Sequence, residues 1–227
     1  MFNDQKKFVE YKDLRWSGIL KNIKKSSNVL QPMFEAFTNS MEAIRLRQNK
    51  GDTFDAYINI ILDFESDLMG ESIDFVSLTI EDNGVGFDEK NFHRLVVFKD
   101  DTKGFNNRGS GRIQMVHTFK QSKYESIYID GDAIKKRSFV LSKLERFINN
   151  NTIIYNMQEP AEANEGEDIK TTLRMSETWL PKDAKELVKL GCDDINPSLT
   201  FNYPFFLLSS TLRFSFAVLC TTNFSRF

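Results

Sequence analysis

Apolar and polar residues alternate along several segments of this chain, in the pattern of strands with one buried face. The clearest case is residues 55–64, where apolar residues recur at every second position. A second strand is expected over residues 74–82, and later strands over residues 126–130, 138–144, 152–157 and 171–175. Residues 159–168 are acidic and contain a glycine, so a connection is expected there.

The spacing of apolar residues becomes that of a helix over residues 30–50. Pro32 suits the first turn of this helix, and Gly51 is placed to end it. The residues expected on its buried face are Phe34, Phe37, Met41 and Ile44. Shorter helices are expected over residues 11–25, 88–98 (capped by Asp88), 111–121 and 181–190. The polar residues 99–108 predict a mobile loop.

This order of elements predicts an α/β (α+β) two-layer sandwich. Helices come first, then two strands, a helix, a loop, another helix and several strands. Helices do not alternate with every strand, which argues against a doubly wound parallel sheet. We therefore expect a mixed, largely antiparallel sheet that helices cover on one face.

Composition adds limits to this picture. The chain has 227 residues, 41% hydrophobic and 27% charged, which is enough for one good core. A net charge of -2 and a pI of about 5.8 leave no overall basic field, so composition makes no case for nucleic-acid binding. Cys192 and Cys220 are too few and too far apart for a disulfide framework or a zinc knuckle, and we expect a reducing, cytoplasmic compartment. Residues 1–10 are polar and carry acidic residues, unlike a signal peptide.

The composition shifts abruptly towards the C-terminus. From Pro197 onward there is no Asp or Glu, and residues 205–220 are strongly apolar apart from Arg213 and a few hydroxyl residues. This apolar run is shorter than a comfortable membrane span. Three explanations stay open: strands of a following domain cut short, a membrane-associated tail, or an altered sequence such as a frameshift. We favour a truncated or altered end.

Candidate chemistry gathers first on the long helix. Glu35, Asn39 and Glu42 stand at i, i+4 and i+7, so all three project from one face beside the apolar stripe. A carboxylate and an amide one turn apart can activate a water molecule and ligate a hard cation. A solvated polar stripe explains the same spacing, so the helix alone does not decide.

Asp82 ends the second expected strand and enters a turn that contains Gly84 and Gly86. Asp-Asn-Gly is favourable β-turn chemistry, which is the simpler explanation. The alternative is that the carboxylate points into a pocket and accepts a hydrogen bond from an exocyclic amine. The two glycines then let a flat base lie against the backbone.

Gly109, Ser110 and Gly111 open a further helix, where backbone N–H groups can bind phosphate at the positive helix end. Arg108 and Arg112 flank them as candidate phosphate partners. Glycines also begin helices for local reasons, and arginines near loops are commonly solvated. No Walker A sequence, G-x-G-x-x-G pattern or G-x-S-x-G elbow occurs, and neither histidine has a metal-ligand partner at helical spacing.

Jointly, these segments resemble the ATP-binding motifs of the GHKL superfamily, which includes gyrase B-type topoisomerases, heat-shock chaperones, sensor histidine kinases, MutL and MORC proteins. In chain order, Glu35-x-x-x-Asn39-x-x-Glu42 resembles the N box, Asp82-x-Gly84-x-Gly86 the first glycine box, and residues 103–116 the lid and second glycine box. The last segment looks most like uncharacterised bacterial ATP-binding proteins. The resemblance covers about residues 10–180. It implies an ATP-binding domain over residues 1–180, followed over 181–227 by a linker helix and the truncated or altered apolar segment.

The resemblance implies a Bergerat-type ATP-binding fold and a role for each matching residue. By position, Glu35 is the general base, Asn39 the Mg²⁺ ligand and Asp82 the residue that holds the adenine amino group. Thr171 is similar to a threonine that lies near adenine on a late strand. The remaining matches are expected to bind the nucleotide: Glu42, Gly84, Gly86, Lys103, Gly109, Ser110, Gly111 and Arg112. The chain departs from the pattern in three places, with Glu42 where relatives usually have Asp, Lys170 in place of a glycine before Thr171, and no glycine directly after Arg112.

The function that this resemblance implies is Mg²⁺-dependent ATP binding with slow hydrolysis that drives a conformational switch. Two alternatives stay open: a phosphotransfer domain of the histidine-kinase type, and a nucleotide-binding module without turnover. Glu35 favours the hydrolase, because kinases of this superfamily usually lack the hydrolytic Glu at that position. An ATP-dependent homodimer and a downstream effector domain or partner protein are further expectations that come from the superfamily alone.

Overall fold

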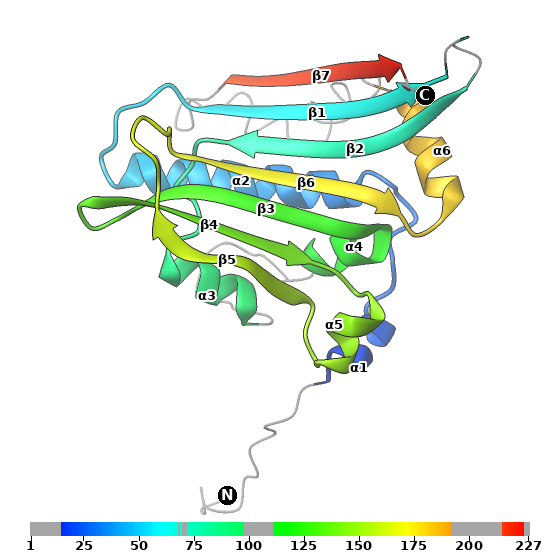
Figure 1. Cartoon of the computed structure of the whole chain (residues 1–227), viewed down its shortest axis with the longest axis horizontal. Coiled ribbons are helices and arrows are strands. Elements are labelled where there is room, and N and C mark those ends of the chain that lie inside the picture. Colours follow the sequence, from blue (N-terminus) through cyan, green and yellow to red (C-terminus); the bar gives the residue numbers. More distant parts are fainter. Residues whose placement is uncertain (1–14, 68, 70–71, 98–110, 192–214, 225–227) are drawn as a thin grey trace, which may run out of the picture.

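A computed structural model of the chain describes residues 15–67, 69, 72–97, 111–191 and 215–224 (Figure 1). Its elements in chain order are α1 (Trp16–Asn22), α2 (Gln31–Asn49), β1 (Tyr57–Ser66), β2 (Ile73–Asp82), α3 (Glu89–Val96), α4 (Gly111–Thr118), β3 (Phe119–Asp130), β4 (Ala133–Leu141), α5 (Glu145–Asn149), β5 (Ile154–Glu162), β6 (Lys170–Thr178), α6 (Pro181–Leu190) and β7 (Ser215–Phe224). The loop expected over residues 99–108 lies outside the described residues.

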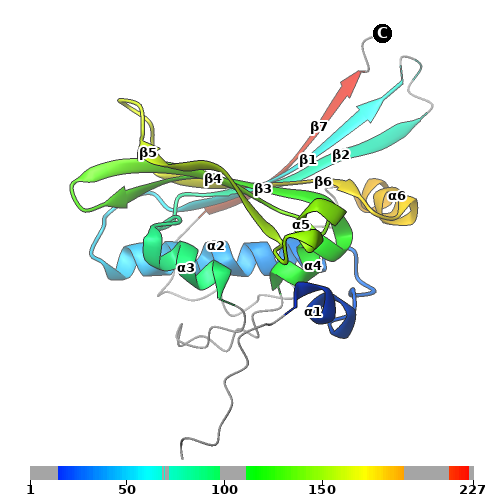
Figure 2. The same cartoon turned by 60° about the horizontal axis from the view of Figure 1, so that its bottom comes forward.

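The strands form one sheet of seven strands in the order β5-β4-β3-β6-β2-β1-β7. Every neighbouring pair is antiparallel except β1 and β7, which are parallel. Helices α1 to α4 lie on one side of this sheet (Figure 2). The expected α+β class, with a mixed, largely antiparallel sheet under a layer of helices, is confirmed at this level.

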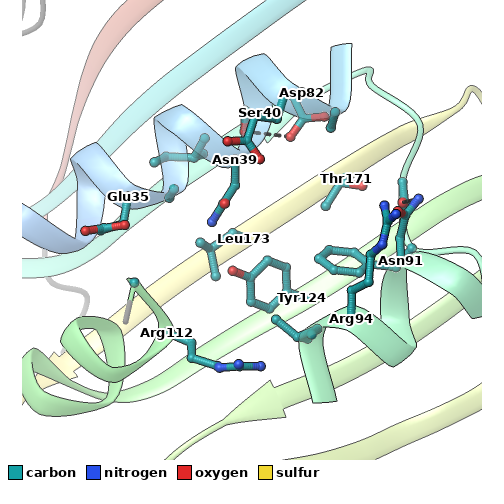
Figure 3. A pocket seen from close by; sticks show the side chains of 18 of the residues that line it. Glu35, Asn39, Ser40, Asp82, Asn91, Arg94, Arg112, Tyr124, Thr171 and Leu173 are labelled. Carbon is teal, nitrogen blue, oxygen red and sulfur yellow. Dashed lines mark hydrogen bonds between the residues drawn. The ribbon is translucent and has the colours of Figure 1, made fainter. Parts of the chain in front are cut away.

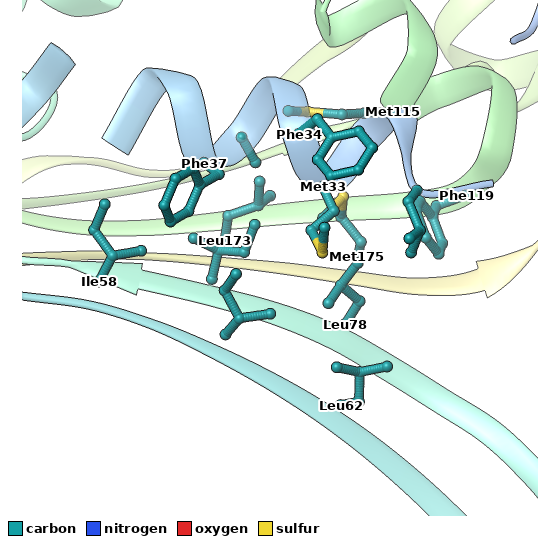
Figure 4. Close-up of a cluster of buried hydrophobic side chains, with 14 of the residues drawn as sticks. Met33, Phe34, Phe37, Ile58, Leu62, Leu78, Met115, Phe119, Leu173 and Met175 are labelled. Atoms are coloured by element: carbon teal, nitrogen blue, oxygen red, sulfur yellow. The ribbon is translucent and has the colours of Figure 1, made fainter. Parts of the chain in front are cut away.

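The core lies between α2 and the sheet (Figure 4). The apolar face predicted for α2 is buried there: Phe34, Phe37, Met41 and Ile44. Opposite them, β1 is buried at every second residue from Ile58 onward, as its alternating pattern predicts. Each large apolar side chain contributes about 1.5–3 kcal/mol on burial, so the stripe holds α2 in one rotation about its axis. That rotation turns the polar face with Glu35 and Asn39 towards α3 and α4 (Figure 3).

Helix α4 ends earlier than its sequence predicts, and β3 begins earlier. The predicted helix over 111–121 ends at Thr118, and the strand expected over 126–130 already starts at Phe119. Trp179 explains the difference, because its indole N–H donates to the carbonyls of Val116, at 2.9 Å, and Phe119, at 3.0 Å. These bonds satisfy carbonyls at the helix end, and the chain then pairs with β6 from Phe119 onward.

The acidic connection expected over residues 159–168 is partly wrong, because β5 continues to Glu162. Lysines on the neighbouring strand explain the extension: Lys135 stands opposite Glu162, and Lys136 stands opposite Ala161. Lys136 also lies 3.8 Å from the carboxylate of Glu167. Opposite charges on adjacent strands favour pairing, which the pattern within one segment does not reveal. The short helix α5 was not predicted either.

The described part of the apolar C-terminal segment is β7, a strand of the main sheet. It runs parallel to β1 along its whole length, from Ser215 opposite Tyr57 to Phe224 opposite Ser66. None of the three explanations considered from the sequence included this pairing. Cys220 is disulfide-bonded, which the cysteine spacing did not predict. Among the described helices, none is long and apolar enough to cross a membrane. The domain boundary after residue 180 stays a prediction.

Candidate functional site

A cavity of about 170 Å³ lies between α2, α3, α4 and the strands β2, β3 and β6 (Figure 3). Eight of the residues predicted from the sequence line it: Glu35, Asn39, Glu42, Asp82, Gly86, Gly111, Arg112 and Thr171. Gly84 does not line it. The predicted site residues Lys103, Gly109 and Ser110 lie outside the described residues.

Helix α2 supplies the polar wall of the cavity. Glu35 is half-buried, Asn39 is exposed and Glu42 is buried. The amide of Gln31, one turn before Glu35, donates a hydrogen bond of 3.0 Å to its Oε1 atom and so orients the carboxylate. The Asn39 amide makes no hydrogen bond with any described residue, which leaves it available to a ligand.

Asp82, at the end of β2, is held inside the cavity by two hydrogen bonds. Its side chain is only 5% exposed. The Ser40 hydroxyl donates to Oδ2 at 2.7 Å, and the Gly84 N–H donates to Oδ1 at 2.9 Å. Burial raises the pKa of Asp82 from an ordinary value of 3.8 to about 6, although these two hydrogen bonds act to lower it. The carboxylate is therefore ionised at pH 7 and fixed in direction.

Thr171 lies beside Asp82 because their strands are neighbours. In the sheet register Thr171 stands opposite Asp82 on one side and Ser126 on the other. The Thr171 and Ser126 hydroxyls are 2.9 Å apart, and the Ser126 hydroxyl accepts the N–H of Phe87 at 3.0 Å. Ser126 was missed by sequence reasoning, since only the register between β3 and β6 reveals its position.

The two glycines after Asp82 have different roles. Gly86 lines the cavity at a φ of +71°, and an added Cβ would lie 2.8 Å from Tyr128 Cβ. Gly84 instead packs on α2, where an added Cβ would lie 2.6 Å from the carbonyl carbon of Ala43. The adjacent Val85 N–H donates to the Ala43 carbonyl at 3.1 Å. Gly84 therefore joins the turn to α2, and its expected contact with a ligand is not supported.

Replacing Gly84 with alanine is expected to destabilise the fold by about 3 kcal/mol, because the new methyl group would overlap the backbone of α2. Urea unfolding followed by circular dichroism measures the change. Gly18→Ala in α1 is the matched control: nothing lies within 4 Å of its added Cβ, so a small gain in stability is expected. Equal unfolding midpoints for Gly84→Ala and the wild type would show that the turn is not packed on α2.

The first turn of α4 meets α2 at Glu35. An added Cβ on Gly111 would lie 2.7 Å from Glu35 Oε2 and 3.1 Å from Glu35 Cβ, so a larger residue there would displace the Glu35 carboxylate. A carboxylate at the first turn of a helix is favoured by the helix dipole. Arg112 lines the cavity as well, but its guanidinium donates to the Val97 carbonyl at 2.8 Å and so joins α4 to the end of α3.

Helix α3 and the sheet complete the cavity with residues that the sequence analysis did not single out. Asn91 and Arg94 project from α3, and the floor includes Tyr124 and Leu173 (Figure 3). The spacing of Asn91 and Arg94, one turn apart on a short amphipathic helix, was the available signal. This spacing indicates a place in the cavity only when the position of α3 opposite α2 is known.

Among the described residues, no group of three or more His, Cys, Asp or Glu side chains could hold a metal ion by itself. A scan of the chain against protein-family models found no match, and a search of curated proteins found none.

Proposed function

We propose that the cavity binds an adenine nucleotide and that the chain is a Mg²⁺-dependent ATPase of the Bergerat type. The observation that carries the proposal is that one cavity holds both the Asp82 carboxylate and the carboxylate–amide pair of Glu35 and Asn39. These groups come from separate elements and suit different parts of one ligand. A buried carboxylate suits a base with an amino group, and a carboxylate beside an amide suits hydrated phosphate chemistry.

The end of the cavity at Asp82 has the character of a base-binding site. Each carboxylate oxygen carries two lone pairs, so Asp82 can accept a further hydrogen bond from an exocyclic amine in addition to those it has. The lining around it includes Ile80, Leu173 and Tyr124, which offer apolar surface to a flat ring. An oxygen in place of the amine, as in guanine, would face the carboxylate as a second acceptor. Adenine is therefore the favoured base.

The end of the cavity at Glu35 has the character of a phosphate site. The N-terminus of α4 provides backbone N–H groups there, and Gly111 keeps the approach open. The exposed Asn39 amide oxygen is a hard ligand of the kind that Mg²⁺ accepts together with phosphate oxygens. When bound, Mg²⁺ would neutralise charge on the phosphates. The donor set present therefore fits a metal held jointly by protein and nucleotide.

Glu35 is the residue of the cavity best placed to act as a general base. Gln31 fixes one carboxylate oxygen, and the other faces Gly111 at the phosphate end. A carboxylate held in this way can orient a water molecule and take its proton as the water attacks the terminal phosphate. The N–H groups at the start of α4 stabilise charge on the phosphate oxygens in the same step.

Titration of the purified chain with ATP, GTP and adenosine in the presence of Mg²⁺, beside a phosphate-release assay with radiolabelled ATP, tests the proposal. We expect ATP to bind at least tenfold more tightly than GTP and to be hydrolysed slowly. Transfer of the label to the protein would instead favour a phosphotransfer domain, and binding without release would favour a module without turnover. If neither ATP nor adenosine binds, the proposal fails.

A further inference from the structure

Helix α3 is fixed in place at both ends, although none of its residues is fully buried. At its start, the Asp88 carboxylate caps the helix by accepting the Asn91 N–H at 2.7 Å, and the buried Arg137 forms an ion pair with Glu89. At its end, Arg112 donates to the Val97 carbonyl. The face that α3 turns to the cavity is therefore set before any ligand binds.

Two polar side chains stand on that face. Asn91 and Arg94 both line the cavity, across from Asn39 on α2 (Figure 3). The Asn91 amide nitrogen donates to the Gly86 carbonyl at 3.2 Å, which leaves its carbonyl oxygen as an acceptor. The Arg94 guanidinium makes no hydrogen bond or ion pair with any described residue.

The charges around the cavity make Arg94 distinctive. Three carboxylates line it, from Glu35, Glu42 and Asp82, and the described cations that line it are Arg94 and Arg112. Arg112 already bonds to Val97. A guanidinium that lines a cavity and has no hydrogen bond or ion pair with the described residues, on a helix that is fixed at both ends, is suited to an anionic ligand group.

We propose that Arg94 binds the phosphate-bearing part of the ligand and Asn91 a sugar hydroxyl, so that α3 makes the cavity select nucleotides over nucleosides. This inference rests on the proposed adenine-nucleotide function. It assigns to α3 a role in ligand recognition. This role is separate from that of Asp82, which holds the adenine amino group, and from that of Glu35, the general base. A charge-assisted hydrogen bond is stronger than a neutral one, so Arg94 carries most of the selection.

Affinities of the full chain for adenosine, AMP, ADP and ATP, measured by calorimetry for the wild type and for Arg94→Gln, test this assignment. We expect Arg94→Gln to lower the affinity for the phosphorylated ligands by about 10–100-fold. The affinity for adenosine should stay within about twofold of the wild-type value. Arg94→Lys should restore part of the loss, because a lysine keeps the charge without the planar fork. Higher salt should weaken ATP binding more in the wild type than in Arg94→Gln.

Lys90→Gln is the matched control, since Lys90 is an exposed cation of the same helix that does not line the cavity. It should leave all four affinities unchanged. Because Arg94 makes no hydrogen bond or ion pair with the described residues, Arg94→Gln should melt at about the same temperature as the wild type. Equal losses for adenosine and ATP would mean that Arg94 covers the base, and unchanged affinities would mean that it is only solvated; both overturn the inference. If no adenine ligand binds the wild type, the proposed function itself fails.

Discussion

Replacing Glu35 with glutamine is expected to remove ATP hydrolysis while ATP binding survives. A positioned general base contributes about 10²–10⁴-fold to a rate, and an amide cannot take the proton of the attacking water. Glutamine keeps the length of the side chain and an oxygen that can accept the hydrogen bond from Gln31. The cavity should therefore keep its shape, and the loss should appear in kcat.

Single-turnover phosphate release and a binding titration on the same preparation separate the two effects. We expect at least a 100-fold lower rate for Glu35→Gln and a dissociation constant within about threefold of the wild type. Glu35→Ala should behave in the same way, with a less ordered cavity wall. Glu65→Gln, at an exposed carboxylate of β1 that does not line the cavity, is the control and should be fully active. Unchanged turnover in Glu35→Gln would remove this residue from the mechanism.

The parts of the site that could be predicted from the sequence depend on local spacing. Glu35, Asn39 and Glu42 line one cavity because a helix places i, i+4 and i+7 on one face, and the apolar stripe beside them fixes which way that face turns. Asp82 could be placed at a strand end followed by a glycine turn for the same reason. In each case the information lies within about two turns of chain.

The parts that could not be predicted depend on pairings between distant segments. Ser126 contacts the cavity residue Thr171 only because β3 pairs with β6 in a register that sets the two residues opposite each other. Gly84 looked like a ligand contact in the sequence, and its packing on Ala43 needs the position of α2. The end of α4 depends in the same way on Trp179, which follows β6. Periodicity within a segment contains no information on such partners.

The parallel pairing of β7 with β1 is the largest difference between the fold expected from the sequence and the structure. Parallel strands need a long crossover, so their partners cannot be read from a hairpin turn. Within the described strand β7, Val218 packs against the main core, which accounts for one of its apolar residues. Composition alone had suggested a boundary.

Replacing Asp82 with asparagine is expected to lower the affinity for adenosine and for ATP about 100-fold, while the fold is kept. The Asn oxygen can still accept the Gly84 N–H, and the Ser40 hydroxyl can turn to accept from the new amide. The amide nitrogen would then point a donor at the donor of the base, and a lost charge-assisted hydrogen bond costs about 1.5–3 kcal/mol, besides the unfavourable contact. Calorimetric titration measures the loss, and urea unfolding checks the fold. Wild-type dissociation constants for adenosine and ATP in Asp82→Asn would contradict the proposal that Asp82 holds the adenine amino group.

The raised pKa of Asp82 provides a second, independent test of whether this residue holds the base. Binding of adenosine should weaken as the pH falls below about 6, because the carboxyl group becomes protonated and stops acting as an anionic acceptor. Adenosine is the suitable ligand, since a terminal phosphate itself titrates near pH 6.

The folded state takes up the Asp82 proton at about pH 6 and the unfolded chain only near pH 3.8. The contribution of Asp82 to the free energy of unfolding should therefore rise as the pH falls between these values, while ligand affinity falls. Asp82→Asn should remove both pH effects, and a wild-type adenosine affinity that stays constant from pH 7 to pH 5 would show that this carboxylate does not hold the base.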